Sequence, residues 1–462
     1  MTIWFDVEDL IRYFHGASRP TGIQRFSFQT YRAVWRQAGA SGDVRFCRRN
    51  PGQQGFRRIH FPALEAGILA AGARAHPPVP TVARSASPLA RAARRLPLQY
   101  RLPLGVLARA GGTAAKATRE LALAPLRGDP ARISGVGGHQ FDLQGPPITF
   151  APGDWLVNLG APWTSPYNPE LLGAMRAQGC GFALLAHDMI PALFPEWCTQ
   201  TMVQDFSTWL TDVVPHADQM FAVSHNTAKD FLRCAAGAGK PAARPLVLPV
   251  GANDPAGQPS PRIQPNPYVL MVGTIEARKN HHAMMRVWRR LLEDLPRSAV
   301  PDLVFAGKLG WLTTDLLEQL RNAAWFGGKI RWVESPSEAQ LANLYQHCEF
   351  SVFPSFYEGW GLPVTESLSH GKTVVASNQG AIPESGGEFC LYFDPDDTGE
   401  ACALIRDLLE NPARVAALEA RIRTSFCPPA WGDTASALLA ALGLAQQSSP
   451  AEQQSPYQRA KG

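Results

Sequence analysis

The 462-residue sequence lacks the marks of an exported, disulfide-bonded or zinc-binding protein. Its eight cysteines are scattered, none in CxxC spacing and none beside a histidine cluster, which argues against structural zinc and a disulfide framework. No stretch approaches the roughly 20 apolar residues of a membrane-spanning helix. The first ten residues, MTIWFDVEDL, carry three acidic residues where a secretory signal needs an uninterrupted apolar run. We therefore expect a cytoplasmic protein, whose contact with a membrane would be peripheral, at the inner face of the plasma membrane.

Positive charge is concentrated in one segment. Residues 60–132 hold ten Arg and one Lys against three acidic residues, a net charge of +8, whereas the whole chain carries +5. Leu and Val alternate with Arg there, and anionic lipid headgroups attract such segments by about 1 kcal/mol per basic residue. Docking on an anionic membrane surface and an Arg-rich insertion without a partner both remain open. Few aromatic residues and no recognisable motif argue against nucleic acid as a partner.

The chain is too long for one ordinary core, so two domains are expected. In both halves, apolar runs typical of strands alternate with helix-like patterns such as residues 24–37 and 169–178, which predicts parallel α/β sheets. A Pro- and Gly-rich stretch, residues 251–267, has the composition of an exposed connection between domains. The predicted strands are residues 2–5, 155–159, 182–186 and 219–223 in the first half, and 268–272, 303–306, 330–333, 350–353 and 373–376 in the second.

The strongest chemical signal is the segment SFYEGWGLPVTESLS, residues 355–369. It follows an apolar strand-like run and places a Gly-containing loop before a helix with proline in its first turn, where the missing N–H needs no partner. The N–H groups of Gly361 and Leu362, with the positive end of the helix, then form a site for a diphosphate. Glu366 lies about one turn into the helix, within reach of a ribose diol. Glu358 lies in the loop, where it can bond sugar hydroxyls near the reacting carbon.

Glu358 and Glu366 resemble the E-x7-E motif of the retaining glycosyltransferases of family four, which have the GT-B fold. The surrounding pattern PS-x-x-EG-x-GLP-x-x-E makes the match specific, although this chain has Glu366-Ser367 where the family usually has Glu-Ala. The resemblance covers residues 150–443 well and the first 40 residues loosely. It implies an α/β chain with two Rossmann-like doubly wound domains and a cleft between them.

The resemblance also implies a division of the chain. Residues 1–250 would form the acceptor-side domain, with the Arg-, Ala- and Pro-rich insertion at about 60–135, and residues 267–425 would form the nucleotide-sugar-binding domain. A helix in residues 426–445 would cross back to the first domain. Residues 446–462 are rich in Gln, Ser and Pro, which is typical of a disordered tail.

Two further segments resemble the family. VGTIEARKNH, residues 272–281, is similar to its G-x-x-x-x-RKN segment, which implies that Arg278 and Lys279 bind the donor diphosphate; two cations can stabilise that leaving group without a metal. His187 and Asp188 follow a predicted strand, at the edge where doubly wound sheets bind ligands. The resemblance implies that His187 contacts the donor sugar, and that Asp188 orients it or approaches the acceptor; a purely structural HD pair is the alternative.

PTGIQR, residues 20–25, resembles the glycine-containing first loop of the family, beside the phosphates. Gly22 would allow close approach of the backbone to the ligand, and Arg25 could face an anionic group; a plain turn leading into a helix is the alternative. Asp394-Pro395-Asp396 formally matches DxD, the metal motif of the other main glycosyltransferase fold. It lies in a Pro-containing turn far along the chain from the Glu motif, so we interpret it as a surface turn and expect no metal.

Taken as a family member, the chain would be a metal-independent retaining hexosyltransferase. It would move a sugar, mannose being favoured, from a GDP- or UDP-linked donor to a glycan or polyprenyl-diphosphate-linked acceptor, in surface polysaccharide synthesis. No cofactor beyond this donor substrate is expected. Two alternatives remain: a GT-B nucleotide-sugar epimerase, and a non-catalytic GT-B subunit that binds a sugar nucleotide or a membrane.

Overall fold

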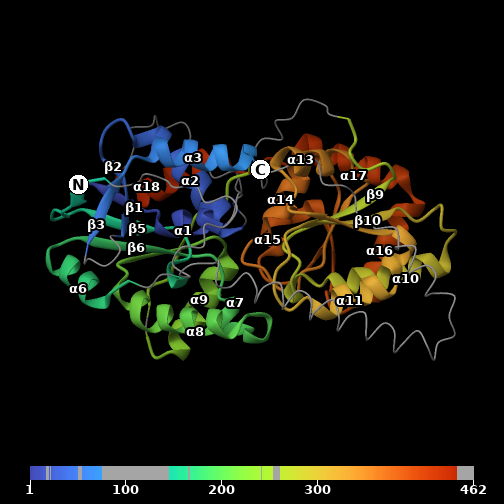
Figure 1. Ribbon diagram of the computed structural model, residues 1–462, viewed down its shortest axis with the longest axis horizontal. Coiled ribbons are helices and arrows are strands. Elements are labelled where there is room, and N and C mark those ends of the chain that lie inside the picture. Colours follow the sequence, from blue (N-terminus) through green and yellow to red (C-terminus); the bar gives the residue numbers. More distant parts are fainter. Residues whose placement is uncertain are drawn as a thin grey trace, which may run out of the picture. The chain divides into compact units, whose positions relative to one another are not determined.

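The computed structural model describes residues 1–16, 20, 22–49, 55–74, 145–164, 167–240, 242–252 and 261–444 (Figure 1). These residues contain two β-sheets, each with helices on both faces. We call residues 1–252 the first half and residues 261–425 the second half. The predicted tail, residues 446–462, lies outside the described residues, as does most of the Arg-rich segment.

The first sheet has eight strands in the order β4-β3-β2-β1-β5-β6-β7-β8. The six neighbouring strands β2, β1, β5, β6, β7 and β8 are parallel to one another. At the β2 edge the sheet continues with β3 and β4, and the pairs β2–β3 and β3–β4 are antiparallel. The order reverses between β1 and β5, which places a topological switch point there. The strands are β1 (Ile3–Asp6), β2 (Val44–Arg49), β3 (Phe56–Ile59), β4 (Pro147–Ile148), β5 (Trp155–Asn158), β6 (Gly181–Ala186), β7 (Gln219–Ala222) and β8 (Leu246–Val247).

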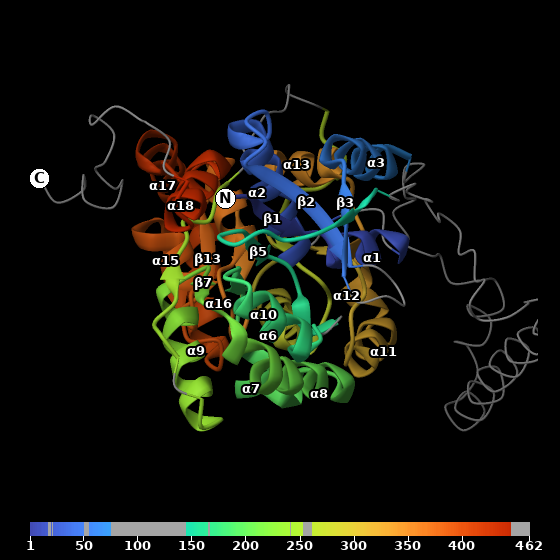
Figure 2. The ribbon, with the colours of Figure 1, turned by 90° about the vertical axis from the view of Figure 1, so that its left-hand side faces the viewer.

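Alternate side chains of the first sheet enter two cores, as expected for strands buried on both faces. Ile3 and Phe5 of β1 pack with α1, α2 and α3, whereas Trp4 packs on the other face with α6 and α8. Figures 1 and 2 show these helices on the sheet. The helices of this half are α1 (Glu8–Gly16), α2 (Ile23–Ala38), α3 (Phe61–Arg74), α6 (Pro169–Ala177), α7 (Ile190–Leu193), α8 (Gln200–Thr208) and α9 (His225–Gly237); the short helical turns are η3 (Pro162–Thr164), η4 (Pro195–Trp197), η5 (Trp209–Val213) and η6 (Val214–His216).

Helix α3 bears on the limits of the Arg-rich segment. Phe61, Leu64 and Ile68 of this helix are at most 3% exposed and belong to the core that also holds β1. The start of the range expected to be an insertion is therefore part of the first half's own core, and a deletion meant to test the basic residues has to begin after Arg74.

The second sheet has six parallel strands in the order β11-β10-β9-β12-β13-β14, which reverses between β9 and β12. Its strands are β9 (Tyr268–Val272), β10 (Asp302–Gly307), β11 (Ile330–Glu334), β12 (Ser351–Phe353), β13 (Val374–Ser377) and β14 (Cys390–Phe393). Its helices are α10 (His281–Asp294), α11 (Thr314–Asn322), α12 (Ala324–Gly328), α13 (Glu338–His347), α14 (Leu362–Ser369), α15 (Ile382–Gly386), α16 (Thr398–Glu410) and α17 (Pro412–Ser425), with the short turns η7 (Ala277–Lys279) and η8 (Gly387–Phe389).

All nine predicted strands are confirmed to within two residues at each end, because each is a short apolar run bounded by turn residues. The strands β2, β3 and β4 were not foreseen. β2 and β3 carry five arginines between them, and β4 has only two residues, so none of these three shows a continuous apolar run.

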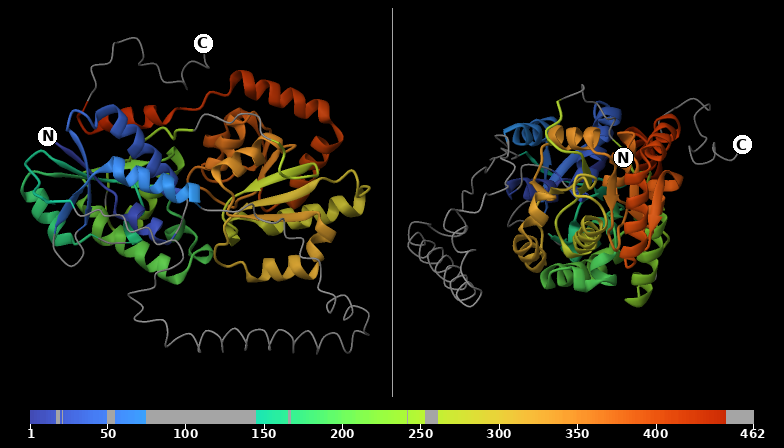
Figure 3. Two further views of the ribbon diagram at one scale, coloured as in Figure 1. Left: turned by 45° about the horizontal axis from the view of Figure 1, so that its top comes forward. Right: turned by 90° about the vertical axis from the view of Figure 1, so that its right-hand side faces the viewer.

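The last described helix, α18 (Trp431–Ala441), packs beside α2 of the first half (Figures 1 and 3). Leu438 and Leu439 enter the same core as Phe5, the Trp431 ring lies 5.6 Å from the Phe26 ring, and the Thr434 hydroxyl donates to the Pro249 carbonyl at 2.7 Å. The chain thus crosses from the second sheet back onto the first.

The described part of the connection between the two halves, residues 261–267, is exposed as its composition suggests, apart from Gln264. Gln264 is only 3% exposed, and the Ile263 N–H donates to the Asn343 side chain at 3.1 Å.

All eight cysteines lie among the described residues and are free thiols. Within the described ranges, no helix is both long and apolar enough to cross a membrane.

Candidate functional site

The turn from β12 into α14 carries the first candidate carboxylate. The backbone changes direction at Gly361, whose φ of 113° is a left-handed conformation that suits glycine. A Cβ there would lie only 3.1 Å from the Ser385 hydroxyl oxygen. Among the described residues, no side chain caps α14, so the N–H groups at Gly361 and Leu362 remain available to an anion.

Glu358 lies in this turn and is 8% exposed. Its carboxylate accepts from Lys279 Nζ at 2.5 Å and pairs with Arg278 Nη1 at 2.6 Å. Burial raises the pKa of this carboxyl, but the two cations outweigh burial and lower the pKa to about 2. Glu358 is therefore a fixed anion at any physiological pH.

Arg278 and Lys279 owe their position to the turn η7 after β9. Asn280 ends the turn with a left-handed φ of 58°, and its side-chain oxygen accepts from the Ala283 N–H, which starts α10. Arg278 also pairs with Glu276 at 2.7 Å. Burial lowers the pKa of Arg278, but the carboxylates of Glu358 and Glu276 outweigh burial and raise it. The two cations therefore face two carboxylates, Glu276 and Glu358.

The second motif carboxylate, Glu366, is held from both sides. Its Oε1 pairs with Arg25 of α2, and its Oε2 accepts from the Tyr345 hydroxyl at 2.9 Å. Arg25 also pairs with Glu338 at 2.6 Å. The anionic group expected opposite Arg25 is thus provided, in this structure, by two carboxylates of the second half.

Gly22 precedes α2 with a left-handed φ of 49°, and a Cβ there would meet nothing within 4 Å. The glycine is therefore needed for the turn and not for close packing. Helix α2 begins directly after Gly22, so Arg25 lies in its first turn, where it pairs with Glu366. Sequence reasoning named both residues but did not foresee that they pair.

His187 and Asp188 directly follow β6. The His187 ring is 6% exposed, its Nε2 bonds the Leu159 carbonyl at 2.8 Å, and burial lowers its pKa to about 4. The ring is therefore neutral near pH 7, and the bond to a carbonyl assigns the proton to Nε2, which leaves Nδ1 as an acceptor. Burial raises the pKa of Asp188, partly offset by Arg278.

The end of β6 touches the Glu358 turn directly. A Cβ at Gly359 would lie 1.9 Å from the His187 carbonyl oxygen and 2.9 Å from the Asp188 Cβ, so only glycine fits. Asp188 also interacts electrostatically with Arg278 and Glu358. The structure therefore brings together five residues that the sequence placed in three separate motifs: His187, Asp188, Arg278, Lys279 and Glu358.

Three residues of the site were missed from the sequence. Tyr345 and Glu338 lie on α13 and reach Glu366 and Arg25 only through helix packing, so no local pattern marks them. Glu276 lies within a quoted motif, and an acidic residue two positions before Arg278 is the sequence signal that could have found it. In the structure it is 4% exposed and pairs with Arg278.

Asp394 and Asp396 are exposed, and the Asp396 N–H donates to the Asp394 carboxylate at 3.0 Å within the turn before α16. This geometry is that of a surface turn. Across the described ranges, no three His, Cys, Asp or Glu side chains are grouped so that they could hold a metal ion.

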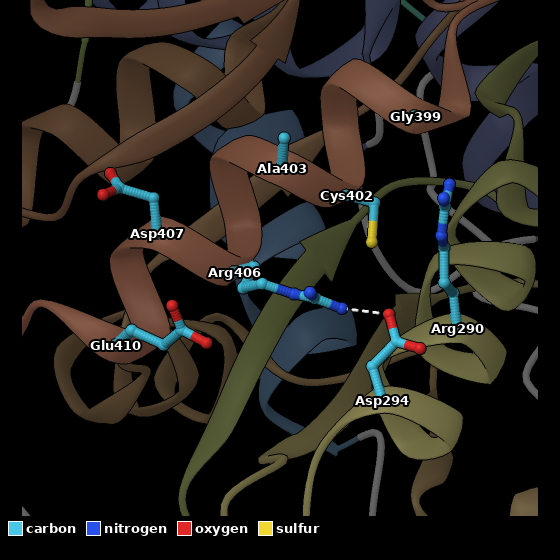
Figure 4. Close-up of a pocket in the computed structure, with 8 residues that line it drawn as sticks. All are labelled: Arg290, Asp294, Gly399, Cys402, Ala403, Arg406, Asp407 and Glu410. Carbon is cyan, nitrogen blue, oxygen red and sulfur yellow. Dashed lines mark hydrogen bonds and ion pairs between the residues drawn. The ribbon is translucent and has the colours of Figure 1, made fainter.

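A surface hollow of about 370 Å³ lies between α10 and α16 and contains none of the candidate residues (Figure 4). Arg406 pairs with Asp294 across it. Its lining residues are Arg290, Asp294, Gly399, Cys402, Ala403, Arg406, Asp407 and Glu410.

Comparison with known proteins finds similar sequences for part of this chain. Residues 256–425 match the family model described as glycosyl transferases group 1. The serotype-specific mannosyltransferase WbdA of Escherichia coli is 29% identical over 278 residues, which cover 55% of this chain and 33% of WbdA. The O-antigen chain mannosyltransferase B of Escherichia coli is 37% identical over 144 residues, 31% of this chain and 37% of that protein. The chain thus spans only about a third of the length of these curated relatives.

Solved structures show the same architecture across nearly the whole chain. The Anabaena protein Alr3699/HepE, solved with UDP and glucose, superposes with a TM-score of 0.57 over 96% of this chain and 99% of that one, at 15% identity. Sucrose-phosphate synthase from Thermosynechococcus elongatus gives 0.54 over 96% and 98%, at 18% identity. The prediction of two Rossmann-like domains is confirmed: the chain has the GT-B fold, and its residues 256–425 match the family model of the group 1 glycosyl transferases.

Proposed function

We propose that this protein is a retaining, metal-independent hexosyltransferase that uses a nucleotide diphosphate sugar, with mannose as the favoured sugar and GDP or UDP as the carrier. The observation that carries the proposal is the Glu358 carboxylate, buried and paired with both Arg278 and Lys279 beside the uncapped start of α14. The choice of mannose rests on relatives that are named as mannosyltransferases.

In this proposal the donor lies along the start of α14. Glu366 accepts hydrogen bonds from the ribose diol, and the N–H groups of Gly361 and Leu362 bind the diphosphate, next to the positive end of the helix. Arg278 and Lys279 neutralise the charge that develops on the leaving diphosphate. Because both cations are paired with Glu358, the donor has to share them with that carboxylate.

The sugar lies between Glu358 and the end of β6. His187 accepts a sugar hydroxyl at Nδ1, and Asp188 orients the ring or approaches the acceptor. The bond from the anomeric carbon to the diphosphate oxygen breaks, and the acceptor oxygen bonds the same face of that carbon. The departing phosphate oxygen takes the acceptor's hydroxyl proton, so configuration is retained without a protein nucleophile.

We propose as acceptor a glycan or a polyprenyl-diphosphate-linked saccharide, in surface polysaccharide synthesis. The Arg-rich segment would hold the protein on an anionic membrane surface, where such an acceptor lies. The charge of that segment is the support for this part of the proposal.

The first test is thermal unfolding of the full chain with GDP-, UDP- and ADP-sugars, each with and without EDTA. A ligand that binds only the folded state raises the melting temperature as its concentration exceeds Kd. We expect a shift selective for one base that survives EDTA. If folded protein shows no shift with any donor, the donor site is wrong.

Product analysis separates the two alternatives. An epimerase would convert the donor sugar without any acceptor, and a non-catalytic subunit would bind the donor and release nothing. Transfer that requires an added acceptor would exclude both.

A further inference from the structure

The turn that carries Glu358 is held by side chains of the first half as well as by its own sheet. The Tyr357 hydroxyl donates to the Asp230 carboxylate at 2.5 Å and accepts from the Asn226 amide at 2.8 Å. Asp230 is 6% exposed, and Asn226 also donates to it at 3.1 Å. Both partners lie on α9, so one phenol joins the turn to a helix of the other sheet.

Residues next to Tyr357 in the turn also contact side chains of the first half. The Phe356 ring stacks on the Trp197 ring at 5.5 Å, and the Phe194 ring lies 4.9 Å from the Tyr357 ring. The Thr227 hydroxyl donates to the Gly359 carbonyl at 3.2 Å. The first half therefore contacts the residue on either side of Glu358.

The start of α9 is itself tied to the second half. The N–H groups of His225 and Asn226 donate to the Glu384 carboxylate at 2.8 and 2.7 Å. The Ala381 N–H, in the turn leading to Glu384, donates to the Glu358 carbonyl at 3.0 Å. Both backbone and side chain of α9's first turn thus contact the part of the second half that surrounds Glu358.

We propose that Tyr357, Asp230 and Asn226 form a clasp that positions the Glu358 turn for sugar transfer, with Tyr357 as the positioning residue. This inference rests on the proposed function, because it concerns the same turn. Glu358 directly follows Tyr357, and the Arg278 guanidinium bonds the Tyr357 carbonyl at 2.6 Å as well as Glu358 itself. A displaced Tyr357 therefore shifts both the sugar-binding carboxylate and a diphosphate-binding cation.

The chemistry of the clasp suits a permanent contact. Burial, followed by the hydrogen bond to Asp230, raises the pKa of Tyr357 to about 12, so the phenol remains a hydrogen-bond donor at every working pH. The clasp uses only groups of α9 and the turn, and it touches neither the start of α14 nor Glu366. Its loss is expected to affect the transfer step more than binding of the nucleotide, because a misplacement of about 1 Å can cost a hundredfold in rate.

The experiment compares Tyr357→Phe, Asp230→Ala and Asp230→Asn in the full chain. Tyr357→Phe keeps the ring against Phe194 and removes only the hydroxyl, whereas Asp230→Asn keeps an oxygen that can accept from the phenol. Tyr392→Phe is the matched control, because its hydroxyl bonds the Gly387 carbonyl at 2.8 Å within the second half.

We expect Tyr357→Phe and Asp230→Ala to lower kcat about 10- to 100-fold with donor KM within about twofold. The double variant that combines Tyr357→Phe with Asp230→Ala should have a kcat no lower than that of the poorer single variant, because both changes break the same hydrogen bond. Asp230→Asn should stay within about threefold of the wild type, and Tyr392→Phe should match it. Unchanged kcat in Tyr357→Phe, or a rise in KM alone, would overturn the clasp.

Amide hydrogen exchange over residues 354–362, measured without donor, tests the clasp independently of activity. Tyr357→Phe and Asp230→Ala should speed exchange there, and Tyr392→Phe should not. If the wild type transfers no sugar, the proposed function fails while this measurement still decides the clasp. Exchange that is unchanged in both clasp variants would refute it, and should Asp230→Ala not fold, Tyr357→Phe alone decides.

Discussion

At the scale of single residues, the site is a set of charges that neutralise one another. Arg278 and Lys279 pair with Glu358, and Arg25 pairs with Glu366, so both motif carboxylates are occupied by cations. Buried charges persist only when they are paired, which explains why each motif carboxylate lies against a cation. The proposed donor therefore shares these cations with the carboxylates and binds the free N–H groups at the start of α14.

Lys279→Ala should lower kcat about 10²- to 10³-fold, because one of two cations that stabilise the leaving diphosphate is lost. Steady-state kinetics with the donor found by thermal unfolding measures the effect. Lys372→Ala is the control, since Lys372 pairs with Glu419 at 3.5 Å outside the site. A rise in KM with normal kcat would show that Lys279 only binds the donor.

Glu366→Ala should raise the donor KM about 10- to 100-fold and change kcat little, because a charged hydrogen-bond acceptor of the ribose contributes about 1.5–3 kcal/mol. Glu338→Ala is a matched control, since Glu338 shares Arg25 but its side chain is 61% exposed. Equal effects of the two substitutions would mean that loss of the Arg25 pairing, and not of a ribose contact, changes KM.

Asp9 offers a test of buried charge by pH. It is 4% exposed, one of its carboxylate oxygens has no hydrogen-bond partner among the described residues, and burial raises its pKa from 3.8 to about 7. The folded protein therefore holds a proton that the unfolded chain releases between these values, and the wild type loses stability as pH rises through this window.

Asp9→Asn removes this titration and keeps the shape of the side chain. The melting temperature of the variant minus that of the wild type should be higher at pH 8.5 than at pH 5 by about 2–5 °C. Asp43→Asn, at an exposed position, should show no such trend. The same difference at both pH values would mean that Asp9 does not titrate between them.

At the scale of elements, the last helix belongs to the core of the first half although it follows the second half in sequence. Leu438→Ala removes a fully buried side chain of α18 and should lower the free energy of unfolding by about 2–5 kcal/mol. Leu246→Ala, at a leucine that is 47% exposed, is the control. Chemical denaturation measures both; equal losses would show that α18 is not part of this core.

At the scale of the whole molecule, the Arg-rich segment is the proposed link to a membrane. Changing the nine arginines of residues 84–132 to Gln removes that charge without disturbing α3. Sedimentation with anionic vesicles should fall strongly while donor turnover in solution stays normal, because each basic residue near the surface contributes about 1 kcal/mol.

Neutral vesicles and a variant with Arg414, Arg421 and Arg423 changed to Gln are the controls. The last three lie on α17 and are 46–56% exposed, so they are charges without the proposed role. Unchanged binding of the first variant to anionic vesicles would leave the segment as an insertion without a membrane partner.

The sequence by itself determined what depends on local pattern. Short apolar runs between turn residues identified nine strands, and the spacing of Glu358, Gly361 and Glu366 identified the turn into α14. The same local reasoning could not find β2 and β3, because their arginines hide the apolar pattern. It also assigned the start of α3 to an insertion, since composition does not report packing.

Only the tertiary structure decided which charges meet. Arg25 and Glu366 are 341 positions apart, and Tyr357 and Asp230 are 127 apart, so no spacing rule relates them. Their pairing follows from where two separate sheets place α2, α9 and the turn into α14. A local motif specifies the groups that can bind a nucleotide sugar, whereas long-range packing fixes the partners that hold those groups in place and set their protonation.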